Sequence, residues 1–561
     1  MVSKLSKLSM LSKLGAIVLL SLTAAAVRAQ QPGLESLQTR AERTRFVETS
    51  RYDDAVGFLA AVDAASPLVH LTTFGYSFEG RALPLAVVGK VPAPTAEAVR
   101  ASGKLRVYIQ ANVHAGEVEG KEATLALVRD VARGSHAEWL DSMVLLVAPV
   151  FNADGNERVN LTNRERENGP VAGAGTRNNA QGLNINRDYI KLETPEARSQ
   201  AMLLNDFDPH VMLDLHATNG SYHAYHLTYE TPNNPAAYTG IVELARRQWL
   251  PAVADAVRAE TGWELRAYGN TGGPGGFGGP PPDRADTGDW DGPPPGGAGG
   301  GQATERRWTT VEDLPRYSHN YWGLRNRFGI LGETYSYLPF AERVAVCSRF
   351  VEAVLDYAHA NAAALQRLTA EADAKNLVGQ RLSLRSRPKR SDEQVEILMG
   401  EVEPEVNPYS GRVMLRRKDV RKPELMWAYE TFESTEQERV PSAYYVPAGL
   451  AQVVERLRAH GVRLERVSGE RKLPLERFAV ETTALAEREF EKHRERTATG
   501  RYEAVEATVA DGAWRVDMRQ PLARLAFHLL EPRSGDSLLA WNFLDGALKD
   551  GAEYPILRTR D

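Results

Sequence analysis

His114 and Glu117 lie three residues apart in the segment His114-Ala115-Gly116-Glu117. The preceding run Leu105–Ala111 is rich in apolar and β-branched residues and predicts a buried strand, and a helical pattern begins at Glu117. At such a strand-to-helix turn, both side chains can point at one place beyond the carboxyl end of the strand. Imidazole and carboxylate groups are common ligands of zinc. Because a segment of this kind often occurs by chance, a metal site also needs a ligand from elsewhere in the chain.

His216 is the candidate for that further ligand. It follows the run Val211-Met212-Leu213-Asp214-Leu215, at the carboxyl end of a predicted strand, where open α/β sheets place their ligands. Taken alone, a histidine in this place is more typical of a hydrogen-bonded structural residue. Together with His114 and Glu117, it completes the set of three protein ligands that a catalytic zinc uses beside a water molecule. The sequence therefore predicts one Zn²⁺ ion per chain at these residues.

The order of these residues along the chain resembles that of the zinc carboxypeptidase family, the carboxypeptidase A-like metallopeptidases. That family has an HxxE segment after a strand, an Asn-Arg pair downstream, a distant His after another strand, and a Glu near the end of the catalytic domain. This chain has the first segment, then Asn186-Arg187, then His216, then Glu333 within Leu331-Gly332-Glu333-Thr334-Tyr335. The match covers about residues 65 to 360. It implies a peptidase that releases C-terminal amino acids.

The resemblance also implies roles for individual residues. Glu333 would take a proton from the attacking water and hand it to the leaving amine. Asn186 and Arg187 would bind the terminal carboxylate of a peptide substrate, a task suited to a guanidinium fork. The alternative is a structural loop in which Arg187 pairs with Asp188 or Glu196. The predicted substrate is thus a peptide with a free C-terminal carboxylate.

Other parts of the site are less closely matched. Arg177 corresponds to the arginine that stabilises the oxyanion, although Arg164 and Arg166 compete for this role. Tyr317 and Tyr321 are both candidates for the tyrosine that covers the substrate, and packing in the core or at the rim is the alternative for each. Two positions depart from the family: Asn184 stands where an aspartate often orients the first zinc histidine, and Gly116 replaces an arginine that contacts substrate.

Two rival functions remain open at this point. A zinc amidase or deacylase could use the same His-Glu-His site on acylated amino acids or cell-wall peptides. A binding protein without activity, acting through its C-terminal region, is the remote alternative, and the complete ligand set plus Glu333 argues against it.

Residues 30–375 alternate short β-branched runs with helical patterns, which is typical of an α/β sheet with helices on both faces. The resemblance implies a mixed sheet flanked by helices for this catalytic domain. Besides the strand at 105–111, we expect strands at Met143–Val150, His210–Leu215 and Phe328–Leu331. Within the domain, residues 269–301 are a Gly/Pro-rich loop insertion, either inert or acting as a lid.

Residues 376–561 are predicted to form a β-rich accessory domain of unknown role. The basic stretch Arg381–Arg390 is interpreted as a solvated linker at the domain junction. Strand-like residues Ala513–Asp517 and helix-like segments at Leu450–His460 and Thr482–His493 follow. The single cysteine, Cys347, falls in an apolar-periodic helix and is expected to pack in the core.

The N-terminus has the pattern of an export signal. Lys4, Lys7 and Lys13 precede an apolar run from Leu14, and Val27-Arg28-Ala29 has small residues at both cleavage positions. We predict a signal peptide at residues 1–29 and a periplasmic or extracellular protein without a stable membrane anchor, since the run is shorter than the ~20 residues of a spanning helix. The net charge of −5 does not favour a nucleic-acid partner. The oligomeric state is left open.

Overall fold

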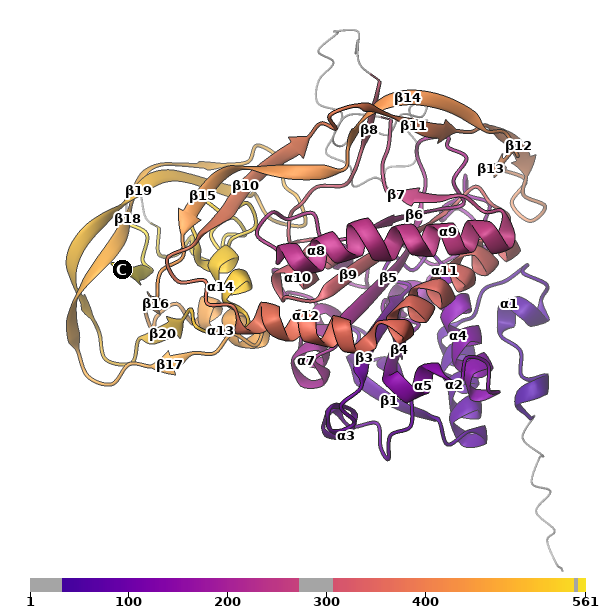
Figure 1. Cartoon of the computed structure of the whole chain (residues 1–561), viewed down its shortest axis with the longest axis horizontal. Coiled ribbons are helices and arrows are strands. Elements are labelled where there is room, and N and C mark those ends of the chain that lie inside the picture. The colour runs from indigo at the N-terminus through magenta and orange to yellow at the C-terminus, as the bar shows by residue number, and fades with distance from the viewer. Residues whose placement is uncertain (1–32, 272–305, 549–552) are drawn as a thin grey trace, which may run out of the picture.

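The computed structural model describes residues 33–271, 306–548 and 553–561 (Figure 1). The predicted signal peptide and most of the Gly/Pro-rich stretch 269–301 lie outside these ranges. A helix-flanked α/β part is followed by a β-rich C-terminal part, drawn in orange and yellow, which lies at the left and along the top of Figure 1. The predicted fold class is therefore confirmed.

The α/β part is built on a mixed sheet with the strand order β1-β2-β4-β3-β5-β9-β6-β7. The central strands β4, β3, β5 and β9 are parallel, whereas β1, β2 and the β6–β9 pair are antiparallel. Every strand that the sequence predicted here is present. The bounds are β1 (Val69–Tyr76), β2 (Ala82–Val88), β3 (Leu105–Ala111), β4 (Met143–Ala148), β5 (Val211–Thr218), β6 (Leu227–Glu230), β7 (Leu265–Ala267) and β9 (Phe328–Tyr335).

Helices cover both faces of this sheet. On one face α4 (Glu119–Ala132) comes so close that a Cβ atom added to Gly120 would lie 2.7 Å from the Leu215 Cβ. The helix α11 (Phe340–Ala360) packs on the same face and buries Cys347, as predicted. The helices α7 (Pro195–Phe207) and α10 (Ser318–Leu324) cover the other face. The remaining helices are η1 (Leu34–Ser36), α1 (Arg40–Arg43), α2 (Tyr52–Ala65), α3 (Ala96–Ala101), α5 (Trp139–Ser142), α6 (Ala153–Glu157), η2 (Ile185–Arg187), α8 (Thr239–Leu244), η3 (Ala245–Trp249), α9 (Leu250–Thr261) and α12 (Ala362–Ala374).

The C-terminal part is a set of antiparallel ladders with two helices. Its largest sheet has the order β17-β20-β16-β21-β18-β19. One strand of the α/β part, β8 (Arg307–Thr309), pairs in parallel with β14, so the two parts share hydrogen bonds. The elements are β10 (Arg381–Lys389), β11 (Gln394–Met399), β12 (Val402–Val406), β13 (Val413–Arg417), β14 (Lys422–Tyr429), β15 (Thr431–Arg439), β16 (Ala443–Val446), α13 (Ala451–Ala459), β17 (Glu465–Arg466), β18 (Arg471–Leu485), β19 (Arg496–Val509), β20 (Trp514–Asp517), α14 (Ala523–Leu530) and β21 (Leu557–Thr559).

Two predictions for this region are wrong. The basic stretch 381–390 is a strand, β10, and not a solvated linker, because it pairs with β15 and buries the alternate residues Leu382 and Leu384. The segment 482–493 is not helical, because residues up to Leu485 belong to β18 in its long antiparallel ladder with β19. Long-range pairing has decided the conformation of Thr482–Leu485, against the helical pattern of the segment. The helix α13 and the strand β20 are present as predicted.

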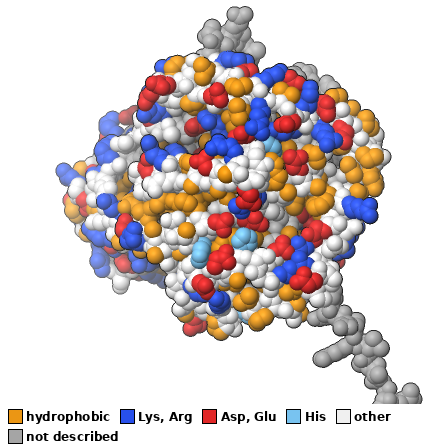
Figure 2. All heavy atoms as spheres, turned by 45° about the vertical axis from the view of Figure 1, so that its right-hand side comes forward, with side chains coloured by type: hydrophobic (Ala, Val, Ile, Leu, Met, Phe, Trp, Pro, Cys, Tyr) orange, Lys and Arg blue, Asp and Glu red, His pale blue; other side chains and the backbone are white. Residues whose placement is uncertain are grey.

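The surface view in Figure 2 shows basic and acidic side chains interspersed over one face of the molecule. Among the helices of the described ranges, none combines the length and the apolar character that crossing a bilayer requires.

Candidate functional site

The turn after β3 carries the first two candidate ligands. Asn112 adopts a left-handed conformation, with φ of 61°, and its side-chain amide donates to the backbone oxygens of Ala115 and Glu117, both at 3.2 Å. An asparagine tolerates this conformation better than most residues. The turn that it stabilises brings His114 and Glu117 over the end of the strand, where both are buried.

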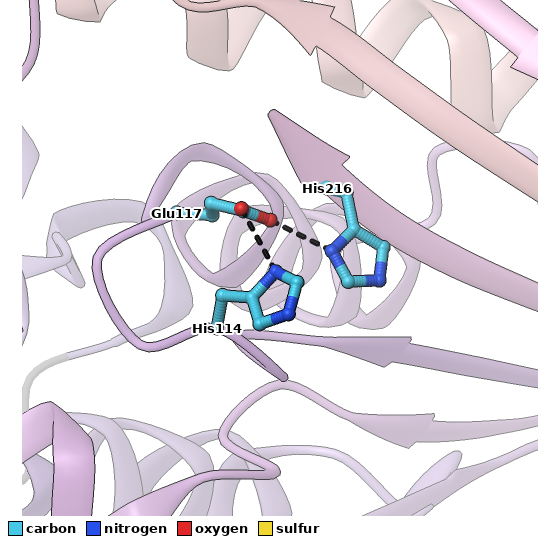
Figure 3. Close-up of side chains that lie close together, drawn as sticks. All are labelled: His114, Glu117 and His216. Carbon is cyan, nitrogen blue, oxygen red and sulfur yellow. Dashed lines mark hydrogen bonds and ion pairs between the residues drawn. The ribbon is translucent and has the colours of Figure 1, made fainter. Parts of the chain in front are cut away.

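His216 meets them from the neighbouring strand β5, as Figure 3 shows. Its Nδ1 lies 2.7 Å from Glu117 Oε2, and His114 Nδ1 lies 2.9 Å from Glu117 Oε1. One possible ligand atom from each of the three residues lies within 4.8 Å of the others. Two imidazole nitrogens and a carboxylate in this arrangement are a known ligand set of catalytic zinc, which keeps a further position for water.

The outer nitrogen of each histidine lies next to a polar side chain. His216 Nε2 lies 3.0 Å from Asp214 Oδ2, and His114 Nε2 lies 3.1 Å from Asn184 Oδ1. Such partners fix the orientation of a ligating histidine and, when charged, raise its basicity. Asn184 thus contacts the histidine that the family's aspartate would orient. The contact from Asp214 was not predicted, although its place two residues before His216 on one strand put both side chains on one face.

The surrounding charges shift the pKa values of the three residues in different directions. Burial opposes protonation of His216, but the carboxylates of Asp214 and Glu117 together raise its pKa well above the usual value. Burial and the charge of Arg177 lower the pKa of His114 to about 3. Burial acts against ionisation of Glu117, but neighbouring positive charges hold its pKa well below the usual range. The site therefore presents an ionised carboxylate, one neutral imidazole and one protonated imidazole, whose proton would be released when a divalent metal ion binds.

Arg164 approaches Glu117 from the side of Gly116. Its Nη2 atom lies 2.6 Å from Glu117 Oε1, and its Nη1 atom lies 2.7 Å from Glu167 Oε1. A Cβ atom on Gly116 would lie only 2.8 Å from the Arg164 side chain. Gly116, which replaces the family's arginine, therefore leaves room for the side chain of Arg164.

Arg177 also reaches the three residues. Its Nη1 atom lies 3.4 Å from His114 Nδ1 and 3.9 Å from Glu117 Oε1. Both Arg164 and Arg177 are thus close to the place where a metal ion and a substrate oxygen would meet. The backbone oxygen of Arg166, by contrast, bonds to Leu415 of the C-terminal part.

Glu333 lies on β9 as the register partner of His216 on β5. Partners on adjacent parallel strands project from the same face, so the carboxylate points toward the side of the sheet that carries the three candidate ligands. Burial, reinforced by the charges of Glu117 and Asp214, raises the pKa of Glu333 to about 8. A metal ion beside it would lower that pKa again, because a positive charge favours the carboxylate. A base with a pKa near neutrality is suited to proton transfer.

The predicted carboxylate-binding pair lies in the short helix η2. Asn186 Oδ1 and Arg187 Nε are buried without a hydrogen-bond partner in the described structure. Arg187 Nη1 donates to Asn186 O, and its guanidinium carbon lies 4.3 Å from the centre of the Tyr317 ring. Asp188, the alternative partner of Arg187, instead accepts hydrogen bonds from the backbone of Glu193 and Thr194. The pair therefore keeps polar atoms available for a ligand.

The two candidate tyrosines have different surroundings. Tyr317 is half-buried, and its hydroxyl donates to Glu312 Oε2 at 3.3 Å. Tyr321 is only 1% exposed, and its hydroxyl lies 2.9 Å from His460 Nδ1. The position of Tyr321 fits core packing, the alternative given for it above.

Tyr268 is a tyrosine that the sequence did not indicate. It follows β7 directly, and its hydroxyl accepts a hydrogen bond from Asn270 at 3.2 Å. Burial and the nearby carboxylate of Glu333 raise its pKa. The sequence did not indicate Tyr268 because it lies next to the Gly/Pro-rich stretch, where no motif identifies a functional residue.

Comparison with known proteins adds an independent finding. Residues 56–246 match a family model described as zinc carboxypeptidase. The range contains the three candidate ligands and the Asn186-Arg187 pair and ends before Glu333.

Individual relatives match over a shorter stretch. Carboxypeptidase 2 from Trichophyton tonsurans is 33% identical over 120 residues, and carboxypeptidase 2 from Trichophyton rubrum is 32% identical over 120 residues. Each alignment covers 20% of this chain and 19% of the relative, so the chain spans about a fifth of the length of these relatives. A metallo-carboxypeptidase from Burkholderia cenocepacia has a solved structure that aligns with a TM-score of 0.36 at 16% identity, over 55% of this chain and 69% of that one.

Proposed function

We propose, from the premise that this chain carries a domain of the zinc carboxypeptidase family, that the protein is a metallocarboxypeptidase, which releases C-terminal amino acids from peptides. The observation that carries the proposal is the convergence of His114, Glu117 and His216 within 4.8 Å, with Glu333 on the adjacent strand. The three residues would hold one zinc ion per chain. Zinc in such a site supplies Lewis acidity, which polarises a carbonyl group and makes a water molecule more acidic.

The remaining steps belong to side chains of the protein. Glu333 takes a proton from the attacking water and transfers it to the amine of the leaving residue, so that one carboxylate serves as base and then as acid. Arg177 stabilises the negative charge that develops on the carbonyl oxygen. Its guanidinium already lies 3.4 Å from His114.

Asn186 and Arg187 bind the terminal carboxylate of the substrate. The support is that both carry buried polar atoms without a partner among the described residues, since leaving such atoms unsatisfied is costly unless a ligand pairs with them. Tyr317 packs against Arg187 and limits the directions in which the guanidinium can point. The partner of the site is thus a peptide with a free C-terminus.

We further propose that residues 1–29 are a cleaved signal peptide and that the mature protein is periplasmic or extracellular. Residues 30–375 form the catalytic domain and residues 376–561 the accessory domain. The support for this division is that α12 ends at Ala374 and β10 begins at Arg381.

Mass spectrometry of a mixed peptide library incubated with the purified protein tests the proposed activity. We expect shortening from the C-terminal end only, and little shortening of the same peptides with amidated C-termini. Internal cleavage, or equal cleavage of acid and amide, would reject the carboxypeptidase assignment in favour of an endopeptidase or an amidase.

A further inference from the structure

A tight turn of the C-terminal part reaches the loop that carries the candidate substrate-binding pair. The turn links β18 to β19, and Phe490 and His493 exchange backbone hydrogen bonds of 2.7 and 2.9 Å across it. Its two central residues, Glu491 and Lys492, lie between them. Two backbone hydrogen bonds therefore close the turn, with Glu491 and Lys492 at its tip.

Three consecutive residues of this turn contact the loop 181–193. Glu491 Oε2 accepts a hydrogen bond from the backbone amide of Asn184 at 3.0 Å. Lys492 Nζ donates to the backbone oxygen of Gln181 at 2.8 Å. His493 Nε2 lies 3.0 Å from Glu193 Oε2. Two of the contacts thus fall near the beginning of the loop and one at its end.

Asn184, the residue that Glu491 contacts, also makes two contacts within the candidate site. Its side-chain oxygen accepts a hydrogen bond from the backbone N–H of Asn186 at 2.9 Å and so caps the short helix η2. The same oxygen lies 3.1 Å from His114 Nε2. One residue therefore links the turn to a candidate metal ligand and to the Asn186-Arg187 pair.

The backbone conformation of the turn does not favour the residues found at its two central positions. Glu491 and Lys492 have φ values of 49° and 64°, in the left-handed region that asparagine and glycine favour in two-residue hairpin turns. Glutamate and lysine are unfavourable there, and residues kept in such conformations often mark functional positions. Their side-chain contacts with the loop 181–193 account for their presence.

Neighbouring residues of the C-terminal part hold the same region. The ammonium of Lys191, which is buried, lies 4.8 Å from the centre of the Trp541 ring. Arg316, immediately before Tyr317, is 2.7 Å from Asp536 and 2.6 Å from Glu495. The segments that contain Lys191 and Arg316, which lie near Arg187 and Tyr317, thus both contact the C-terminal part.

We infer that Glu491 is a positioning residue of the catalytic site, and that the C-terminal part completes this site by fixing Asn184 and, through it, η2. Glu491 acts through Asn184 and touches no reacting atom. The consequence for substrate binding rests on the proposed function, whereas the ordering of the loop 181–193 does not.

Hydrogen exchange measured by mass spectrometry tests the ordering without any assay of activity. A Glu491→Ala variant should exchange the amides of the loop 181–193 about tenfold to hundredfold faster than the parent, the usual effect of losing a hydrogen bond to a charged group. A Glu489→Ala variant is the matched control, because Glu489 is an exposed acid of the same connection. Unchanged exchange in the Glu491→Ala variant would overturn the inference.

A second variant separates positioning from stability. Replacing Glu491→Asn together with Lys492→Gly gives the turn the residues that its backbone favours, while the shorter side chain no longer reaches Asn184. Because the favourable turn residues offset part of the lost contacts, we expect a smaller fall in melting temperature than in the Glu491→Ala variant. The loop should still exchange faster, and the KM for a free-acid peptide should rise by about tenfold with a much smaller change in kcat. A Glu491→Gln variant, which keeps an acceptor oxygen, should restore much of the parent KM.

The outcomes distinguish the two proposals. If the parent fails to discriminate acid from amide peptides but the loop still loosens in the Glu491→Ala variant, the proposed function fails and the positioning role stands. If discrimination is present but the loop and KM are unaffected in both variants, the positioning role is rejected.

Discussion

Replacing Asp214→Asn should weaken zinc binding without removing any proposed ligand. Asp214 Oδ2 lies 3.0 Å from His216 Nε2, and both side chains are almost fully buried. Because His216 Nδ1 faces Glu117, Nε2 is the nitrogen that lies next to the Asp214 carboxylate. Asparagine has nearly the same size and shape as aspartate, so the variant removes mainly the charge. Loss of such a partner typically costs about 10-fold to 100-fold in metal affinity, which is ~1.4–2.7 kcal/mol.

Asn184→Ala provides the comparison on the other histidine. Its contact with His114, at 3.1 Å, involves an uncharged acceptor, and a neutral hydrogen bond contributes about 0.5–1.5 kcal/mol. Competition with a chromophoric zinc chelator at constant pH measures both dissociation constants. We expect the Asp214→Asn variant to bind zinc more weakly than the Asn184→Ala variant. The reasoning is refuted if the Asp214→Asn variant binds zinc within twofold of the parent, or if the order of the two variants is reversed.

Further predictions concern proton transfer, substrate recognition and the junction with the C-terminal part. A Glu333→Gln variant should retain its zinc but lose ~10²–10⁴-fold in turnover, and steady-state kinetics within a few-fold of the parent would reject this role. An Arg187→Ala variant should narrow the difference in kcat/KM between free-acid and amidated peptides by about tenfold to hundredfold, whereas an undiminished difference would place carboxylate recognition elsewhere. The hydrogen bond to Glu193 raises the pKa of His493. Its stabilising effect should therefore be complete below the unfolded pKa of about 6.5 and be lost as pH rises through the higher folded pKa. Denaturant unfolding between pH 5.5 and 9 should show this loss in the parent and not in a His493→Gln variant.

The candidate metal site could be predicted from the sequence because its residues mark the ends of strands. His114 and Glu117 follow β3 and His216 lies within β5, and β3 and β5 are neighbours in the sheet. Apolar runs locate such strands, and parallel strands bring their carboxyl ends to one edge. The contact from Asp214 was within reach of the same reasoning, since its alternation with His216 is a local pattern. Tyr268 could not be predicted in this way, because its proximity to Glu333 depends on the path of the chain after β7 and not on a local pattern.

The C-terminal part shows where local patterns fail. The alternation of Leu382 and Leu384 with basic residues was a strand signal hidden by the high charge of the stretch. The segment 482–493 has a helix-like pattern, yet its first residues, up to Leu485, lie in a long ladder with β19. Pairing between distant segments decides such cases. The contact between Glu491 and Asn184 joins residues far apart in the chain, and no local pattern could predict it.

Metal analysis of the purified protein and of its His216→Ala variant tests the central claim most directly. If His114, Glu117 and His216 are the protein ligands, the parent should contain close to one zinc ion per chain, and the variant should contain almost none after brief dialysis against a chelator that leaves the parent loaded. Full zinc occupancy in the variant, or a parent that binds no zinc, would contradict the assignment of this site.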